Sequence, residues 1–107
     1  MASLIENLIT GLNEEYAVYE KLLEVSMEKT SSIISNNLDR LKATTDKEQA
    51  LVDVITSYES KRNSTMANIA SVLNKKASEL KISDVVSFLD GQPEFREPLV
   101  EINEKLA

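Results

Sequence analysis

The sequence of 107 residues contains no cysteine, no histidine and no tryptophan. Without cysteine the chain can form neither a disulfide framework nor a thiolate site. Without histidine it cannot form the Ser/His/Asp and Cys/His catalytic sets, and it cannot supply the Glu-x-x-His ligands of di-metal helical bundles. The sequence therefore predicts that the protein is not an enzyme and that it uses no metal and no other cofactor.

The chain also lacks an excess of basic residues and a long apolar run. Twelve Lys and Arg residues stand against eighteen Asp and Glu residues, which gives a net charge of −6. Nucleic acids and anionic membranes attract concentrated basic patches, and a membrane-spanning helix needs about 20 consecutive apolar residues. We therefore expect no nucleic-acid partner and no membrane span, and we expect a cytoplasmic protein.

The chain has only two glycines and two prolines, the residues that most often interrupt helices, and neither type occurs between Leu12 and Asp90. This absence predicts an all-α fold with very long helices. Apolar residues of the first segment recur every three or four positions, at Leu4, Leu8, Leu12, Tyr16, Tyr19, Leu23, Met27 and Ile34. Such spacing keeps one face of a helix continuous.

A turn is expected in the Ser- and Asn-rich stretch TSSIISNNLD, where Asn36 followed by Asp39 is typical of a helix start. The heptad pattern that follows, from Leu38 to Leu80, predicts a second helix packed antiparallel on the first as a coiled-coil-like hairpin.

Two weaker signals lie downstream. Ser83 and Asp84 before Gly91 indicate a short third helix, and Pro98 suits the first position of a terminal helix. We therefore expect one helical domain, residues 1–107, with helices at about 3–34, 37–79, 84–90 and from about 98 onward.

Three charged residues, Glu48, Glu59 and Arg62, occupy positions of the second heptad that should be apolar. A metal site at these carboxylates would need histidine, and Glu59 with Arg62 has the spacing of an ordinary ion pair on one helix rather than of a catalytic pair. Two interpretations remain. Either the positions are solvated, or they form polar layers inside the hairpin.

Folding the chain back at residues 36 and 37 brings opposite charges together. Lys29 then lies near Glu48, and Glu15 lies near both Arg62 and Glu59. The hypothesis is a structural polar layer made by five residues: Glu15, Lys29, Glu48, Glu59 and Arg62. Partly buried charges of this kind fix the register of two helices whose leucines alone could slide.

A two-helix hairpin buries only one side of each helix. At about 1.5 Å per residue each long helix would span roughly 50 Å, more than the short downstream elements can cover. We expect Ile5, Ile9, Val18 and Leu22, which lie beside the main stripe, to stay partly exposed. A homodimer would cover them.

The order of several stretches resembles the FlgN family of bacterial flagellar export chaperones. These stretches are EEYAVYEKLLEVSMEK, NNLDRL, KEQALV, YESKR and LKISDVVSFL, and the resemblance extends over nearly the whole chain. It implies an all-helical cytoplasmic chaperone that binds flagellar hook–filament junction proteins and delivers them to the flagellar type III export apparatus. It implies no cofactor and no ATP hydrolysis.

In that family the client-binding segment is an amphipathic region near the C-terminus, and EPLVEINEKLA is similar to the approach to it. The resemblance thus makes Leu99, Ile102 and Leu106 candidate client-binding residues, although they could instead pack the last helix on the hairpin. For the whole chain, the alternative function is a structural coiled-coil scaffold or adaptor that acts through self-association.

Overall fold

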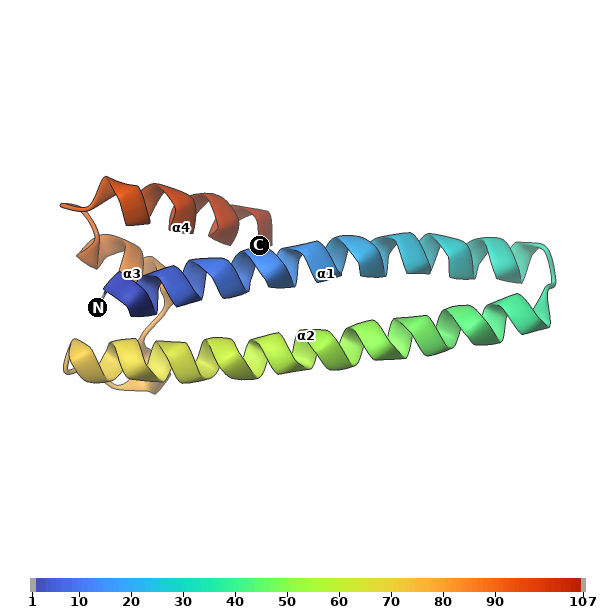
Figure 1. The fold of residues 1–107 in the computed structure, drawn as a ribbon, viewed down its shortest axis with the longest axis horizontal. Coiled ribbons are helices and arrows are strands. Elements are labelled where there is room, and N and C mark those ends of the chain that lie inside the picture. The colour runs from blue at the N-terminus through green and yellow to red at the C-terminus, as the bar shows by residue number, and fades with distance from the viewer. Residues whose placement is uncertain (1, 107) are drawn as a thin grey trace.

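In the computed structural model, which describes residues 2–106, two long antiparallel helices carry three short elements at one end (Figure 1). The elements are α1 (Ala2–Ile34), α2 (Leu38–Val72), the 3-10 turn η1 (Ala77–Glu79), α3 (Ile82–Phe88) and α4 (Pro93–Leu106). The molecule measures 55 × 22 × 20 Å. The all-α class with an antiparallel hairpin, expected from the sequence, is confirmed.

The hairpin turn is built by two consecutive asparagines. Asn36 has a φ of 55°, and the N–H of Asn37 donates to the carbonyl of Ser32 at 3.0 Å, which closes α1 in the manner usually achieved with glycine. The side chain of Asn37 then accepts a hydrogen bond from the N–H of Arg40 at 3.0 Å and caps the start of α2. The helix-start cap is therefore Asn37, not Asn36.

The second helix ends at Val72 rather than near residue 79. Asn74 ends α2 in the same way as Asn36 ends α1. Its φ is 56°, and the N–H of Lys75 donates to the carbonyl of Ala70 at 2.8 Å. The prediction was too long because it relied on glycine and proline as stop signals, whereas asparagine also tolerates the left-handed conformation.

The two short helices begin earlier than expected. The third runs from Ile82 to Phe88 instead of 84–90, and Asp84 accepts a hydrogen bond from the N–H of Lys81 at 2.9 Å. The fourth begins at Pro93, so the proline at its first position is Pro93, and Pro98 lies inside the helix. Pro98 removes one backbone donor, and the burial of neighbouring side chains offsets that loss.

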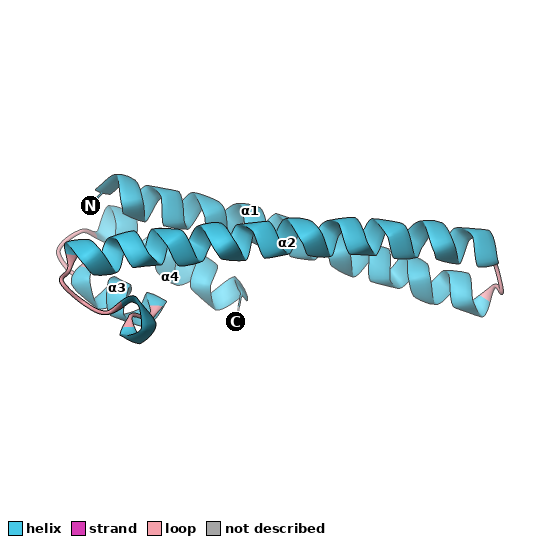
Figure 2. Ribbon diagram, turned by 90° about the horizontal axis from the view of Figure 1, so that it is seen from below, coloured by secondary structure: helices cyan, strands magenta, loops and turns pink. Residues whose placement is uncertain are grey.

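The hydrophobic core lies at the end of the hairpin where α3 and α4 pack (Figure 1). It joins buried side chains from all four α-helices with Leu89, which directly follows α3: Ile5, Leu8, Leu12, Ile69, Val85, Leu89, Leu99 and Ile102. Seen from below, α3 and α4 lie on the same side of the hairpin, and α1 and α2 continue alone toward the turn (Figure 2). One end of the molecule is therefore a small bundle, and the other is a bare two-helix rod.

The apolar stripe predicted for the first helix does not face α2 along its whole length. Leu23 is 60% exposed, and Met27 and Ile34 are also exposed, whereas Ile5, expected to be partly exposed, is fully buried. The helix–helix seam of the rod runs instead through buried Val25 and its neighbours. Near the N-terminus the stripe is mainly the face that α4 covers, and no described residue of α4 packs over Leu23.

Replacing Leu99 with Ala should destabilise the protein by about 3 kcal/mol, because it removes a fully buried side chain from the core. The same replacement at Leu23, on the exposed stripe of α1, should change the free energy of unfolding by less than about 0.5 kcal/mol. Urea unfolding followed by circular dichroism measures both. Similar costs at the two positions would contradict the described packing of α4 on α1.

Candidate functional site

A buried ion pair crosses the middle of the hairpin. Arg62 on α2 donates from Nη1 to Oε2 of Glu15 on α1 at 2.6 Å. The Glu15 side chain is 2% exposed and the Arg62 side chain 32%, so the carboxylate is buried and the guanidinium reaches the surface. The contact holds together two residues that the fold-back hypothesis placed near each other.

The carboxyl group of Glu15 is not fully satisfied by this contact. Its Oε1 is buried without a hydrogen-bond partner among the described residues. Burial raises the pKa of Glu15 above the ordinary value of 4.5, and the Arg62 charge lowers it by less, while the charge of Glu59 raises it further. Because desolvation outweighs the attraction, the pair specifies structure more than it adds stability.

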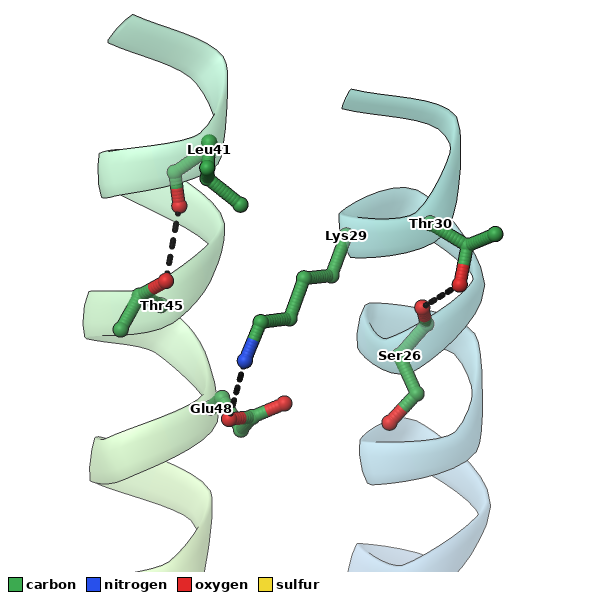
Figure 3. Close-up of polar contacts among 6 residues, drawn as sticks. All are labelled: Ser26, Lys29, Thr30, Leu41, Thr45 and Glu48. Carbon is green, nitrogen blue, oxygen red and sulfur yellow. Dashed lines mark hydrogen bonds and ion pairs between the residues drawn. The ribbon is translucent and has the colours of Figure 1, made fainter. Parts of the chain in front are cut away.

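A second ion pair lies nearer the turn. Lys29 of α1 reaches across to Glu48 of α2, with Nζ 3.2 Å from Oε1, and both side chains are about one-third exposed (Figure 3). The neighbouring hydroxyls of Thr30 and Thr45 donate to carbonyls of their own helices rather than across the seam (Figure 3). Two ion pairs therefore cross between the helices at this level: Lys29 with Glu48, and the more exposed Lys47 of α2 with Glu28 of α1, whose Nζ and Oε2 lie 3.7 Å apart.

The Glu15–Arg62 and Lys29–Glu48 pairs define a single register. Glu15 and Lys29 are two heptads apart on α1, and Glu48 and Arg62 are two heptads apart on α2. A slip of either helix would break both pairs at once and would leave the buried Glu15 carboxylate without its partner. We interpret the four residues as polar layers that align the helices.

Glu59, the fifth residue of the predicted layer, makes no ion pair within residues 2–106. Its charge acts on Glu15 from nearby and raises the pKa of that carboxyl group. The structure therefore brings together four of the five residues as direct pairs and places the fifth beside one of them.

Sequence reasoning overlooked two buried hydroxyls in the seam, Ser32 and Thr44. Each donates to a carbonyl of its own helix, Ser32 to Glu28 at 2.9 Å and Thr44 to Arg40 at 2.7 Å. The sequence holds little signal for them, because Ser and Thr are common on exposed helix surfaces and only the packing of the two helices shows which of these hydroxyls face the seam. Each hydroxyl satisfies itself locally, so the seam can be narrow there.

The surroundings of Glu15 offer little for chemistry. A shallow groove beside it is lined by Gly11, Glu14, Tyr58 and Lys61, and the Lys61 ammonium lies 5.6 Å from the centre of the Tyr58 ring. Among residues 2–106 there is no cluster of acidic side chains that could hold a metal ion. The same part of the chain holds no helix that is both long enough and apolar enough to cross a membrane.

The three candidate client-binding residues lie on α4. Leu99 and Ile102 are buried against α1, and Leu106 is partly buried at the edge of the same core. Lys105, next to Leu106, places its ammonium 5.7 Å from the centre of the Tyr16 ring on α1. In this conformation Leu99 and Ile102 are therefore inaccessible to another protein.

A comparison with known protein families matches the chain to a family model described as FlgN protein, over residues 1–107. No curated protein and no solved structure matches the chain.

Replacing Arg62 with Ala should cost about 2 kcal/mol, between the costs of losing an exposed and a buried ion-pair partner. Replacing Glu15 with Gln should change stability at pH 7 by less than about 1 kcal/mol, because the amide oxygen can still accept from Arg62. The double variant should be more stable than Arg62→Ala alone. Urea melts of all three complete the cycle, and strictly additive effects would show that the two side chains do not interact.

The raised pKa of Glu15 makes a pH dependence predictable. Because the folded state binds the proton more tightly than the unfolded chain, protonation of Glu15 favours folding below the ordinary value of 4.5. That contribution is lost as the pH rises through the folded-state pKa. We expect the wild-type protein to lose stability relative to Glu15→Gln as the pH is raised from about 4 to about 7. Urea melts of both proteins across this pH range test the prediction. If the wild type gained stability relative to Glu15→Gln as the pH rose, the pKa of Glu15 would be lowered in the folded state and not raised.

Proposed function

The chain belongs to the FlgN family, whose members are flagellar chaperones, and from this premise we propose that it binds flagellar hook–filament junction proteins in the cytoplasm and delivers them to the flagellar type III export apparatus. The observation that carries the proposal is the extent of the family match, which includes the hairpin and the α3–α4 end together.

The exposed surface of the rod supports a chaperone role. Large apolar side chains lie in the open on both long helices, among them Leu23, Met27 and Val54. A chaperone that holds an unassembled client needs apolar contact surface, and exposed apolar groups in a chain this short mark interaction sites when they gather on one face. The ion pairs that align α1 and α2 would keep such a surface in a fixed arrangement.

Client binding by the candidate residues on α4 would depend on a change in the position of that helix. Leu99 and Ile102 belong to the core, so client binding through them would require α4 to separate from α1. Leu106, at the edge of the core, is accessible in part without such a change. The assignment of Leu99, Ile102 and Leu106 as client-binding residues stays a prediction.

The structural scaffold remains the rival function, because the same exposed apolar residues could serve self-association into the homodimer expected from the sequence. Neither the homodimer nor the client is fixed by family membership. The two functions differ in what the protein binds in an extract.

The test is capture of partners by the full chain, immobilised and incubated with an extract of flagellated cells, followed by mass spectrometry of the bound proteins. We expect hook–filament junction proteins to be enriched over a resin that carries no bait. A purified junction protein should then bind the chain directly and stay in solution at concentrations where it aggregates alone. Recovery of the bait alone would support the scaffold instead.

A further inference from the structure

The groove beside Glu15 is a space between α1 and α2 that the side chains of the protein leave unfilled. Its volume is about 430 Å³, and its lining comes from α1 and α2 alone, without any residue of α3 or α4. Volumes of about 300–1,000 Å³ are typical of binding sites for small molecules. The groove is therefore large enough for a small ligand.

The space is open because a glycine stands in its wall. Gly11 lies four residues before Glu15 on α1, and Thr65 lies three residues after Arg62 on α2. Because the helices are antiparallel, both steps lead from the ion pair to the same level of the hairpin, where Gly11 and Thr65 both line the groove. We call the space at this level the Gly11 notch, and define it by Gly11, Glu15, Arg62 and Thr65.

The packing of the free protein does not explain a glycine at this position. In a helix interior glycine is less favourable than alanine, because it loses more conformational freedom on folding. A Cβ added to Gly11 would meet nothing within 4 Å apart from its chain neighbours and the backbone of its own helix turn. Glycine allows a ligand to come close to the backbone, and an open notch at Gly11 fits that use.

The carboxyl group of Glu15 supplies an unused acceptor at the notch. Its side chain is 2% exposed, Oε2 accepts from Arg62, and Oε1 has no hydrogen-bond partner within residues 2–106. Long side chains of a helix lean toward its N-terminus, over the residues three or four positions earlier. For Glu15 these are Leu12 and Gly11, and all three line the groove. A buried acceptor without a partner is costly, so a donor placed in the notch would be stabilising.

A small rotation brings Oε1, which is covered in the empty groove, within reach of a ligand. The last torsion of a glutamate side chain is broad, so the plane of the carboxylate can turn at little cost. Arg62 has N–H donors besides the one that contacts Oε2, and its side chain is 32% exposed, so it can follow the carboxylate. The ligand can thus reach Glu15 without breaking the ion pair.

The charges that line the groove cancel. They are two carboxylates, Glu14 and Glu15, and two cations, Lys61 and Arg62. Glu59 does not line the groove, although its charge acts on Glu15 from nearby. An anion would be repelled by the free Oε1, and a cation would compete with Arg62 for the carboxylate. The groove therefore suits a neutral group that has both a hydrogen-bond donor and an acceptor.

We propose that the Gly11 notch binds a primary carboxamide, whose N–H donates to Oε1 of Glu15 and whose carbonyl accepts from the Thr65 hydroxyl. An amide group joins donor and acceptor in one small uncharged unit. Leu8 and Leu12, which also line the groove, would contact the apolar part of the ligand. The ligand is either a free amide or the side-chain amide of asparagine or glutamine, and its binding is independent of the proposed function.

The two glycines of the chain provide a matched pair of variants. An added Cβ has open space at Gly11 and at Gly91, and neither residue has a positive φ. The methyl group of Gly11→Ala would enter the notch, whereas Gly91→Ala lies between α3 and α4, outside the groove. Gly11→Ala should unfold at a higher urea concentration than the wild type, because alanine favours the helix. A loss of binding in this variant would therefore not reflect a loss of fold.

The probe is isobutyramide, titrated into the isotopically labelled full chain and followed by the backbone amide signals of Leu12 and Thr65 in NMR spectra. We expect Gly91→Ala to bind it within about twofold of the wild type. Gly11→Ala and Glu15→Gln should bind it about tenfold or more weakly, since the first fills the notch and the second replaces the free acceptor with a donor. N,N-dimethylisobutyramide, which has no N–H, and the anion isobutyrate should show the same loss with the wild type.

Three results would each overturn the proposal: no saturable change in the wild type, equal binding by the wild type and Gly11→Ala, or equal binding of isobutyramide and its dimethyl derivative. Two further probes distinguish the source of the amide. N-acetyl-glutamine methylamide presents the side-chain amide as it occurs in a polypeptide, and L-glutamine presents it on a free amino acid. Tighter binding of one, lost in Gly11→Ala, identifies the source, and failure of both to bind would also contradict the proposed carboxamide site.

Discussion

The register of the hairpin depends on the contact between Glu15 and Arg62. Burial of the Glu15 carboxylate is tolerated only where the Arg62 guanidinium can pair with it. The two long helices therefore align at one relative position along their axes. That alignment places the apolar residues at the N-terminal end of α1 opposite Ile69 near the end of α2, and together they form the base on which α3 and α4 pack. The interaction adds little net stability, and its contribution is to exclude other alignments that the apolar residues alone would allow.

Much of the architecture could be predicted because the relevant signals are local or periodic. The scarcity of glycine and proline and the spacing of leucines indicated the long helices, and the matching of opposite charges indicated the register. The helix ends were less predictable because Asn74 does what glycine usually does, and the sequence does not show when an asparagine adopts a positive φ. The start of the last helix was predicted at Pro98, because proline favours the first position of a helix. The helix begins at Pro93 instead, and the packing of the residues after Pro98 stabilises it although Pro98 lies inside.

The faces of the helices were the least predictable feature. Apolar residues on α1 form two partly overlapping stripes, one against α2 and one toward α4, and periodicity alone cannot say which partner each stripe meets. Leu23 continues the second stripe by sequence and is exposed because no described residue of α4 packs over it. The burial of residues on this stripe thus depends on where an element packs that lies about seventy or more positions away in the chain. Such dependence is not visible in any local window of sequence.

The concentration of the core at one end also divides the molecule into parts of unequal local stability. Amide hydrogens of α1 near Ile5 are protected by a bundle, whereas those near Asn36 depend on a single helix–helix seam with polar residues in it. Local opening should therefore become easier along the rod, and amide exchange should quicken from the bundle toward the turn. A surface near the turn can adjust to ligands of differing shape, while the bundle at the other end preserves the fold. A ligand bound near the turn would slow amide exchange in the rod alone.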